Sequence, residues 1–140
     1  MTKLDQFKLL MQATKIVMDS GVCPESARIF SDWFRMIMFC HERGYLYLGY
    51  KEGKVDLVAI AYRVNEVTDE TGDEFPDKEE GNILYVPIVA SKSDDKLKLT
   101  RLLRFYLKDN PEVTEIAYHY RNSEKLKRFY LRRQYSGQTK

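Results

Sequence analysis

Residues Asn82–Tyr120 read NILYVPIVASKSDDKLKLTRLLRFYLKDNPEVTEIAYHY and carry the strongest signals of secondary structure in the chain. The nearly continuous apolar start of this stretch, Asn82–Ala90, is typical of a strand covered on both faces. The polar run Ser93–Asp95 then predicts a helix start, because it offers an N-cap followed by acidic residues in the first turn. Val113–Tyr120 predicts a second strand. The stretch is therefore a β-α-β unit, whose strands run parallel or are joined by a crossover that lays the helix on the sheet.

The first strand and the helix of this unit each carry a boundary signal. Pro87 cannot donate a hydrogen bond to a ladder, so it marks an edge, a bulge or the end of the strand. The helix ends at Asp109–Pro111. Its buried stripe consists of Leu99, Leu102, Leu103 and Tyr106. This stripe predicts which side of the helix packs on the sheet.

The sequence before this unit predicts two helices and a hairpin. Residues 1–43 carry apolar residues at helical spacing, interrupted at Ser20-Gly21. Pro24 is placed for the first turn of the second helix, and Gly44 ends it. Two β-prone runs follow, Tyr45–Tyr50 and Val55–Val64, and the turn between them makes them an antiparallel hairpin.

The sequence after the unit predicts one more helix. Asn122 and Ser123 are placed to cap it, and Leu126, Phe129 and Tyr130 would face inward. The order is thus αα, ββ, a long loop, β, α, β, α. We expect an α/β (α+β) fold with a mixed central sheet flanked by helices. We also expect a single domain over residues 1–140, with an N-terminal helical pair at 1–44 and an acidic mobile loop at 66–80.

The composition suits a globular protein and gives no sign of a metal-binding, secreted or membrane protein. The chain has 140 residues with 44% hydrophobic and 31% charged, which suits one globular domain. A net charge of +2 is too small to indicate nucleic acid by itself. Cys23 and Cys40 lack metal-site spacing, so we expect free thiols of a reducing compartment. No signal peptide or membrane-length apolar run is visible, so we expect a cytoplasmic protein with no membrane or metal partner.

The element order and a C-terminal motif resemble the GNAT (GCN5-related N-acetyltransferase) superfamily. The resemblance spans Tyr45–Tyr135. In the segment NSEKLKRFYLRRQY, Phe129-Tyr130 matches the F-Y of the family's last helix and Tyr135 matches its later aromatic residue, whereas Gln134 stands where glycine is usual. The family also normally opens with a strand, and this chain opens with a predicted helix.

The resemblance implies an acyl-CoA N-acyltransferase that acts on an unknown amine, with acetyl-CoA or another acyl-CoA as cofactor. It implies that Tyr130 protonates the departing thiolate, although the residue would equally suit a core position on an amphipathic helix. Glu66 and His119 are candidate general bases. Glu66 could instead simply begin a solvated loop, and His119 could be a structural strand residue.

The implied cofactor contacts lie along the central strand and after it. Backbone groups near Pro87 would meet a pantetheine-like arm where the strands splay apart, and lysines would meet phosphates. A plain strand end is the alternative. The cofactor candidates are Val86, Ile88, Val89, Ala90, Lys92, Lys96, Lys98 and Asn122.

The loop that should hold the pyrophosphate departs from the family pattern [QR]-x-x-G-x-[GA]. Asp94, Leu97 and Leu99 occupy the positions of Gln/Arg, Gly and Gly/Ala. Bulky and acidic side chains oppose close approach of an anion to the backbone. The cap at Ser93–Asp95 would itself occupy the natural anion site.

Two other functions therefore remain open. One is a non-catalytic GNAT-shaped interaction or assembly protein, for example a phage or mobile-element protein in the host cytoplasm, with an unidentified protein partner. The other is weak nucleic-acid binding through the C-terminal helix, since Arg121–Lys140 carries seven basic residues and one Glu. The eight acidic residues of Glu66–Glu80 could engage a basic partner, or could only be solvated. The oligomeric state is not indicated.

Overall fold

The structure is a computed structural model that describes residues 2–20, 30–67, 81–92, 96–119 and 126–131, without the side chains of 96–99 and 119. The elements follow the predicted order up to the last one. They are α1 (Lys3–Asp19), α2 (Phe30–Arg43), β1 (Leu46–Lys51), β2 (Lys54–Val64), β3 (Ile83–Ser91), α3 (Lys96–Asp109), β4 (Glu115–His119) and β5 (Leu126–Tyr130).

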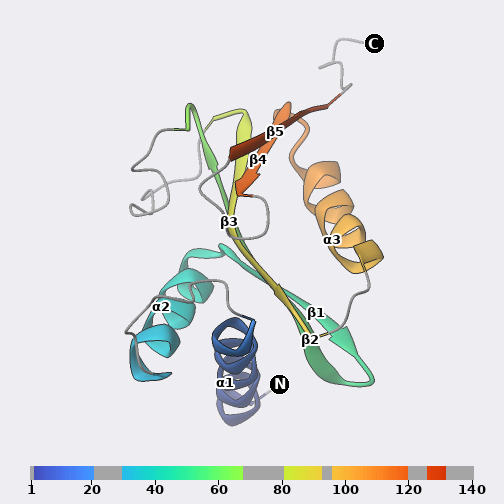
Figure 1. Ribbon diagram of the computed structural model, residues 1–140. Helices are drawn as coiled ribbons and strands as arrows, with labels where there is room; N and C mark the ends of the chain where they lie inside the picture. Colours follow the sequence, from blue (N-terminus) through green and yellow to red (C-terminus); the bar gives the residue numbers. More distant parts are fainter. Residues whose placement is uncertain (1, 21–29, 68–80, 93–95, 120–125, 132–140) are drawn as a thin grey trace.

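The five strands form one mixed sheet in the order β1-β2-β3-β4-β5. Neighbours are antiparallel except β3 and β4, which are parallel and joined through α3. Figure 1 shows α1 and α2 on one side of the sheet and α3 on the other. The predicted fold class, a mixed sheet flanked by helices after an N-terminal helical pair, is confirmed.

The larger part of the core lies between the sheet and the helices α1 and α2. Helix α1 begins at a capping box, in which Asp5 N–H donates to Thr2 Oγ1 at 3.1 Å. Within this core the Tyr62 ring packs against the rings of Tyr45 and Tyr85, with centroids 5.3 and 5.7 Å apart. All three are buried, so aromatic packing ties the strands β2 and β3 to the first residue of the hairpin.

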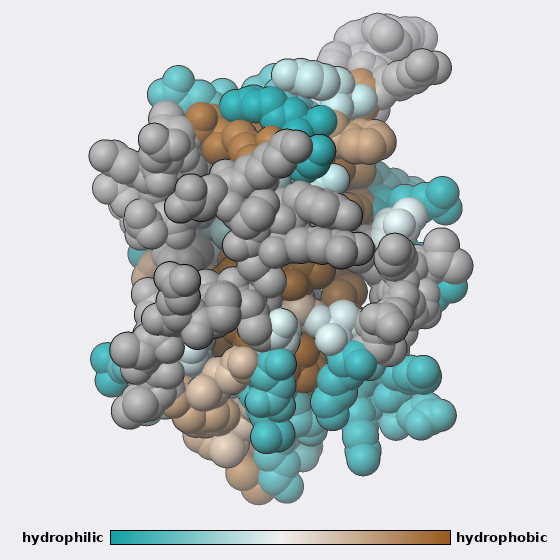
Figure 2. Space-filling model, viewed as in Figure 1, coloured by the Kyte–Doolittle hydropathy of each residue, from teal (hydrophilic) through white to brown (hydrophobic). Residues whose placement is uncertain are grey.

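The helical pair also leaves apolar side chains on the surface. Phe7 and Phe34 make an edge-to-face contact at 5.1 Å between α1 and α2, yet Phe7 is exposed. Figure 2 shows apolar surface at the lower left, where these helices lie, next to hydrophilic surface. No helix in the described part of the chain is long and apolar enough to span a membrane.

The expectation of a final helix is wrong, because residues 126–130 form strand β5. This strand pairs antiparallel with β4, and Arg128 Nη1 lies 2.5 Å from Glu115 Oε2 across the pair. The spacing of Leu126, Phe129 and Tyr130 fits a helix, but in a run this short the hydrophobic pattern of a helix cannot be distinguished from that of a strand. Pairing with β4, where Ala117 is fully buried, outweighs the local preference. The predicted cap at Asn122–Ser123 lies outside the described residues.

The two cysteines differ in what can be said of them. Cys40 is a free thiol buried in the core, and burial raises its pKa to about 12 because it disfavours the thiolate. Cys23 lies outside the described residues.

We expect the Cys40 thiol to resist modification while the chain is folded. The thiolate is the reactive form, and at pH 8 a thiol with a pKa near 12 is almost wholly protonated. In a Cys23→Ser variant, a disulfide reagent at pH 8 should react fully only after denaturation. Fast reaction of the native variant would contradict the burial of Cys40.

Candidate functional site

The strands β3 and β4 separate part of the way along the sheet. Their parallel pairing runs from Ile83 with Glu115 to Val86 with Tyr118. Beyond Val86, β3 continues to Ser91 and pairs with β2 alone. In the part of the chain that the structure describes, this edge of β3 has no strand against it. We call this place, from Pro87 to Ser91, the opening.

A bulge lies where the opening begins. On β2, Ile60 pairs with Ile88 and Tyr62 with Tyr85, so Ala61 faces both Val86 and Pro87. Two residues against one is the pattern of a β-bulge, which bends the strand that carries the extra residue. Pro87 therefore lies at a bulge, one of the three positions that the sequence left open.

The hydrogen-bond pattern shows which backbone groups face the opening. Lys92 N–H donates to the Asp56 carbonyl at 2.9 Å. Because paired residues alternate in an antiparallel ladder, Ala90 and Ile88 also direct their groups toward β2. The N–H and C=O of Val89 therefore point away from β2, toward the opening. This gives the opening a backbone donor and a backbone acceptor.

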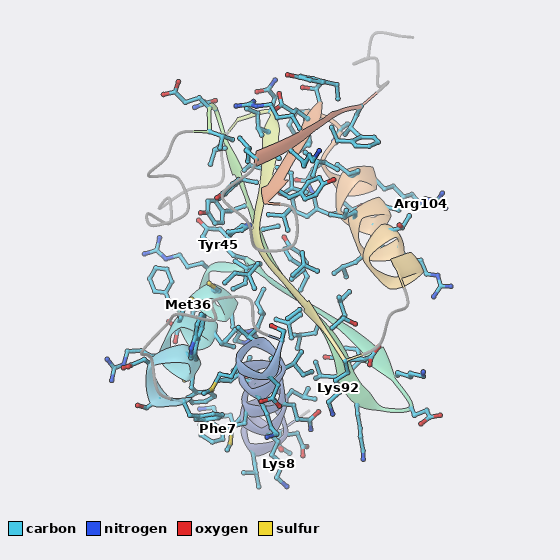
Figure 3. The ribbon with its side chains drawn as sticks, viewed as in Figure 1. Phe7, Lys8, Met36, Tyr45, Lys92 and Arg104 are labelled. Atoms are coloured by element: carbon cyan, nitrogen blue, oxygen red, sulfur yellow. The ribbon has the colours of Figure 1, made fainter. Side chains whose placement is uncertain are left out.

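The predicted cofactor residues lie mostly around this opening. Val86 and Val89 pack on the α3 side, whereas Ile88 and Ala90 pack toward α1 and α2. Lys92 is exposed just after β3 (Figure 3).

The other predicted phosphate contacts are only partly described. Lys96 and Lys98 lie in the first turn of α3, but their side chains are outside the described part. Leu97 is helical there as well. Ser93–Asp95, which the sequence predicts to cap the helix, and Asn122 also lie outside it.

The structure does not bring Tyr130 and Glu66 to the opening. A continuous row of paired residues crosses the sheet from Val64 through Ile83 and Glu115 to Tyr130. This row lies at the start of β3 and β4, roughly 13 Å from Pro87 at a rise of about 3.3 Å per residue. Glu66 follows Val64 at the same end. Tyr130 is 69% exposed there.

His119 and Tyr118 lie at the other end of β4, where the opening begins. His119 is the last residue of the strand. Tyr118 is half-buried on the α3 side and is the last residue of β4 paired with β3. Tyr118 is not among the residues that the sequence indicated for the site, although its alternation with Ile116 along the strand places it on the covered face. The match of Tyr130 to the family motif points instead to the end of the sheet where β3 and β4 begin.

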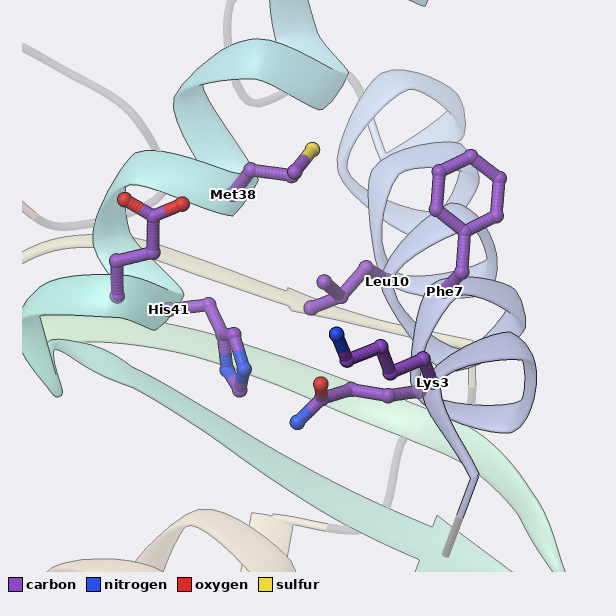
Figure 4. A pocket seen from close by; sticks show the side chains of 7 residues that line it. Lys3, Phe7, Leu10, Met38 and His41 are labelled. Atoms are coloured by element: carbon purple, nitrogen blue, oxygen red, sulfur yellow. The ribbon is translucent and has the colours of Figure 1, made fainter.

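A separate hollow lies between α1 and α2. It has a volume of about 520 Å³, and Figure 4 shows Lys3 and His41 pointing toward one another across it. It is lined by Lys3, Gln6, Phe7, Leu10, Met38, His41 and Glu42. No residue that the sequence predicted for the site lines this hollow. Among the described residues, no group of three His, Cys, Asp or Glu side chains could hold a metal ion.

In the basic C-terminal segment, residues 126–130 form strand β5 rather than part of the helix expected to contact nucleic acid. Within the described residues, Arg128 is engaged with the buried Glu115. Arg128, one of the basic residues that suggested phosphate contacts, thus stabilises the pairing of β5 with β4 instead.

Comparisons with known proteins bear on the fold. A scan against protein-family models finds no match, and a search of the curated proteins finds none either. Solved structures do match. GphF, a GNAT-like decarboxylase in complex with isobutyryl-CoA, has a TM-score of 0.54 at 14% identity and covers 80% of this chain and 61% of its own.

Two further structures give similar values. The loading GNATL domain of CurA from Lyngbya majuscula has a TM-score of 0.52 at 14% identity, with 84% of this chain and 61% of that chain covered. AAC(6')-Ib in complex with ribostamycin and coenzyme A has a TM-score of 0.52 at 17% identity, with 80% and 68% covered. The chain spans about three fifths of the first two proteins, at 61% of each. The fold is that of the GNAT proteins, as the sequence resemblance implied.

Proposed function

Because the chain has the fold of the GNAT proteins, we propose that it binds an acyl-CoA thioester at the opening between β3 and β4 and transfers the acyl group to an amine. The observation that carries the proposal is the edge of β3 beyond Pro87, where Val89 turns its N–H and C=O away from β2. Two of the solved neighbours, GphF and AAC(6')-Ib, are complexes with isobutyryl-CoA and coenzyme A.

An extended arm that carries amide groups suits such an edge. The pantetheine arm of CoA has amides that can pair with Val89 as a further strand would. The arm would run where β4 leaves β3, between the apolar side chains of Val86 and Ile88. Lys92 follows β3 directly in the chain, so its cationic side chain stands on the phosphate side.

The residues at the opening supply the proton transfers of direct acyl transfer. The amine nitrogen attacks the thioester carbonyl carbon, the C–S bond breaks, and the thiolate takes a proton from the Tyr118 hydroxyl. The amine gives up its proton to His119, the last residue of β4. A backbone N–H at the opening polarises the carbonyl as negative charge develops on its oxygen.

Calorimetry with acetyl-CoA and with longer acyl-CoAs tests the binding step. We expect saturable binding to the full chain. Absence of binding at millimolar ligand would contradict the proposal and would favour a non-catalytic interaction role, since a fold alone does not determine a reaction. A second assay, with acetyl-CoA and a panel of acceptor amines, would detect the free thiol of the CoA that is released.

Tyr118→Phe and Tyr130→Phe form a matched pair that tests the assignment of the proton donor. We expect Tyr118→Phe to lower kcat by about 10²-fold while leaving acyl-CoA affinity unchanged, because only the proton donor is lost. Tyr130→Phe should stay within about twofold of the unmodified chain. The reverse ranking would show that the chemistry occurs at the start of β3, contrary to the proposal.

A further inference from the structure

Strand β1 is an edge strand of the sheet, as Figure 1 shows. Ala61 N–H donates to the Tyr45 carbonyl at 3.0 Å, which fixes the phase of the ladder between β1 and β2. By alternation, Leu46 and Leu48 direct their backbone N–H and C=O groups away from β2. In the described part of the chain no strand lies against them. Strand edges of this length and apolar character are sites of strand pairing.

The strand β1 is also regular enough to accept a neighbour. Its register with β2 shifts between Gly49 and Tyr50, where Gly49 pairs with Leu57 and Tyr50 with Val55. The extra residue, Asp56, therefore belongs to β2, and β1 keeps its alternation on the outer side.

Apolar side chains of α3 lie beside this edge strand and extend its surface. The rings of Tyr47 and Tyr106 meet edge to face at 5.6 Å, which places the middle of β1 beside the middle of α3. A hollow of about 360 Å³ lies there, lined by Tyr47, Leu102, Phe105, Tyr106, Asp109 and Asn110. Phe105 is 72% exposed. The strand edge and the exposed ring thus form one continuous patch.

We propose that this patch, the edge of β1 with the Phe105 stripe of α3, is the interface of a twofold symmetric dimer with a second copy of this chain. The inference does not depend on the proposed acyl transfer. Antiparallel pairing of β1 with its copy, centred on Leu48, sets Tyr47 opposite Gly49 of the other copy. A Cβ at Gly49 would lie 3.0 Å from Leu57 Cβ, so a side chain at this position would be crowded. The Tyr47 ring of the other copy covers the bare glycine.

The same twofold axis pairs the helices. Because Tyr47 contacts Tyr106, an axis through Leu48 also passes beside Phe105, and α3 meets its copy antiparallel. That pairing sets Phe105 against its own copy and Asp109 across from Arg101, both of which are exposed. A twofold interface is self-complementary in this way. Arg104 points away from the sheet (Figure 3), so it leaves the stripe apolar.

Sedimentation velocity of the full chain over a wide concentration range tests the dimer. We expect the mass to rise from 16.6 kDa at low concentration toward twice that value. Phe105→Glu should weaken association at least tenfold, because it places like charges against each other at the axis. Phe129→Glu is the matched control, since Phe129 is 62% exposed on β5 at the opposite margin. A monomer at every concentration, or equal effects of the two variants, would overturn the proposal.

Charge reversal and hydrogen exchange give independent readouts. Arg101→Asp and Asp109→Arg should each weaken the dimer, and the double variant should recover it; no recovery would contradict the helix pairing. In the dimer the Leu48 amide should exchange slowly and should lose this protection on dilution, while the Tyr47 amide, which faces β2, should not change. A Leu48 amide that exchanges equally fast at all concentrations would exclude pairing through β1.

Discussion

Replacing Gly81 by alanine is expected to cost roughly 3 kcal/mol or more of the free energy of unfolding. Gly81 stands just before β3 with φ at +104°, in a region that L side chains rarely adopt. A Cβ there would overlap the Val64 carbonyl group at the end of β2. The Gly81 carbonyl also accepts from Arg63 Nε at 2.9 Å, so the segment cannot shift without losing that bond. Chemical denaturation of the variant measures the effect.

Gly53→Ala is the control for this substitution. Gly53 lies in the turn of the β1–β2 hairpin with φ at +77°, but no atom lies within 4 Å of the Cβ position. Only the strain of the left-handed backbone remains, which costs about 1 kcal/mol. Equal costs at the two glycines would mean that the approach of Val64 to Gly81 is not as close as described.

Replacing Val89 by proline is expected to lower acyl-CoA affinity at least tenfold with little loss of stability. Val89 N–H points toward the opening, so proline removes a donor that the pairing of β3 with β2 does not use. Proline is tolerated in strands at such outward positions. Calorimetry with acetyl-CoA and thermal unfolding of the same sample measure the two effects.

Val89→Ala and Ile88→Pro separate the causes. Val89→Ala keeps the N–H and should bind acyl-CoA within a few-fold of the unmodified chain. Ile88→Pro removes a donor that faces Ile60 on β2, and should cost about 1–3 kcal/mol of stability. If Val89→Pro binds normally, the backbone of β3 is not the contact surface for the cofactor.

Most of the fold could be predicted from sequence because its elements carry strong local signals. The run Asn82–Ala90 is apolar enough to predict a covered strand, and β3 follows it closely at Ile83–Ser91. The hairpin and the two N-terminal helices have clear turns between apolar runs. The last element could not be predicted, because Leu126–Tyr130 suits either period and only pairing with β4 decides it.

Of the features around the opening, only the bulge had a local signal in the sequence. Pro87 gave a local signal for the bulge, since its missing N–H restricts where it can lie in a strand. Which end of the sheet is occupied by Tyr118 on β4 and by Tyr130 on β5 follows from strand register, which no local pattern reveals. The outward direction of the Val89 amide likewise follows only from the ladder.

If acyl-CoA binds along the edge of β3 beyond Pro87, the backbone amide resonances of the isotopically labelled chain will report it during titration with acetyl-CoA. We predict that the largest saturable shift is at Val89, with smaller shifts at Ile88 and Ala90, whose amides face β2. Shifts confined to residues that line the hollow between α1 and α2, or no shifts at millimolar ligand, would show that acetyl-CoA does not bind at this edge.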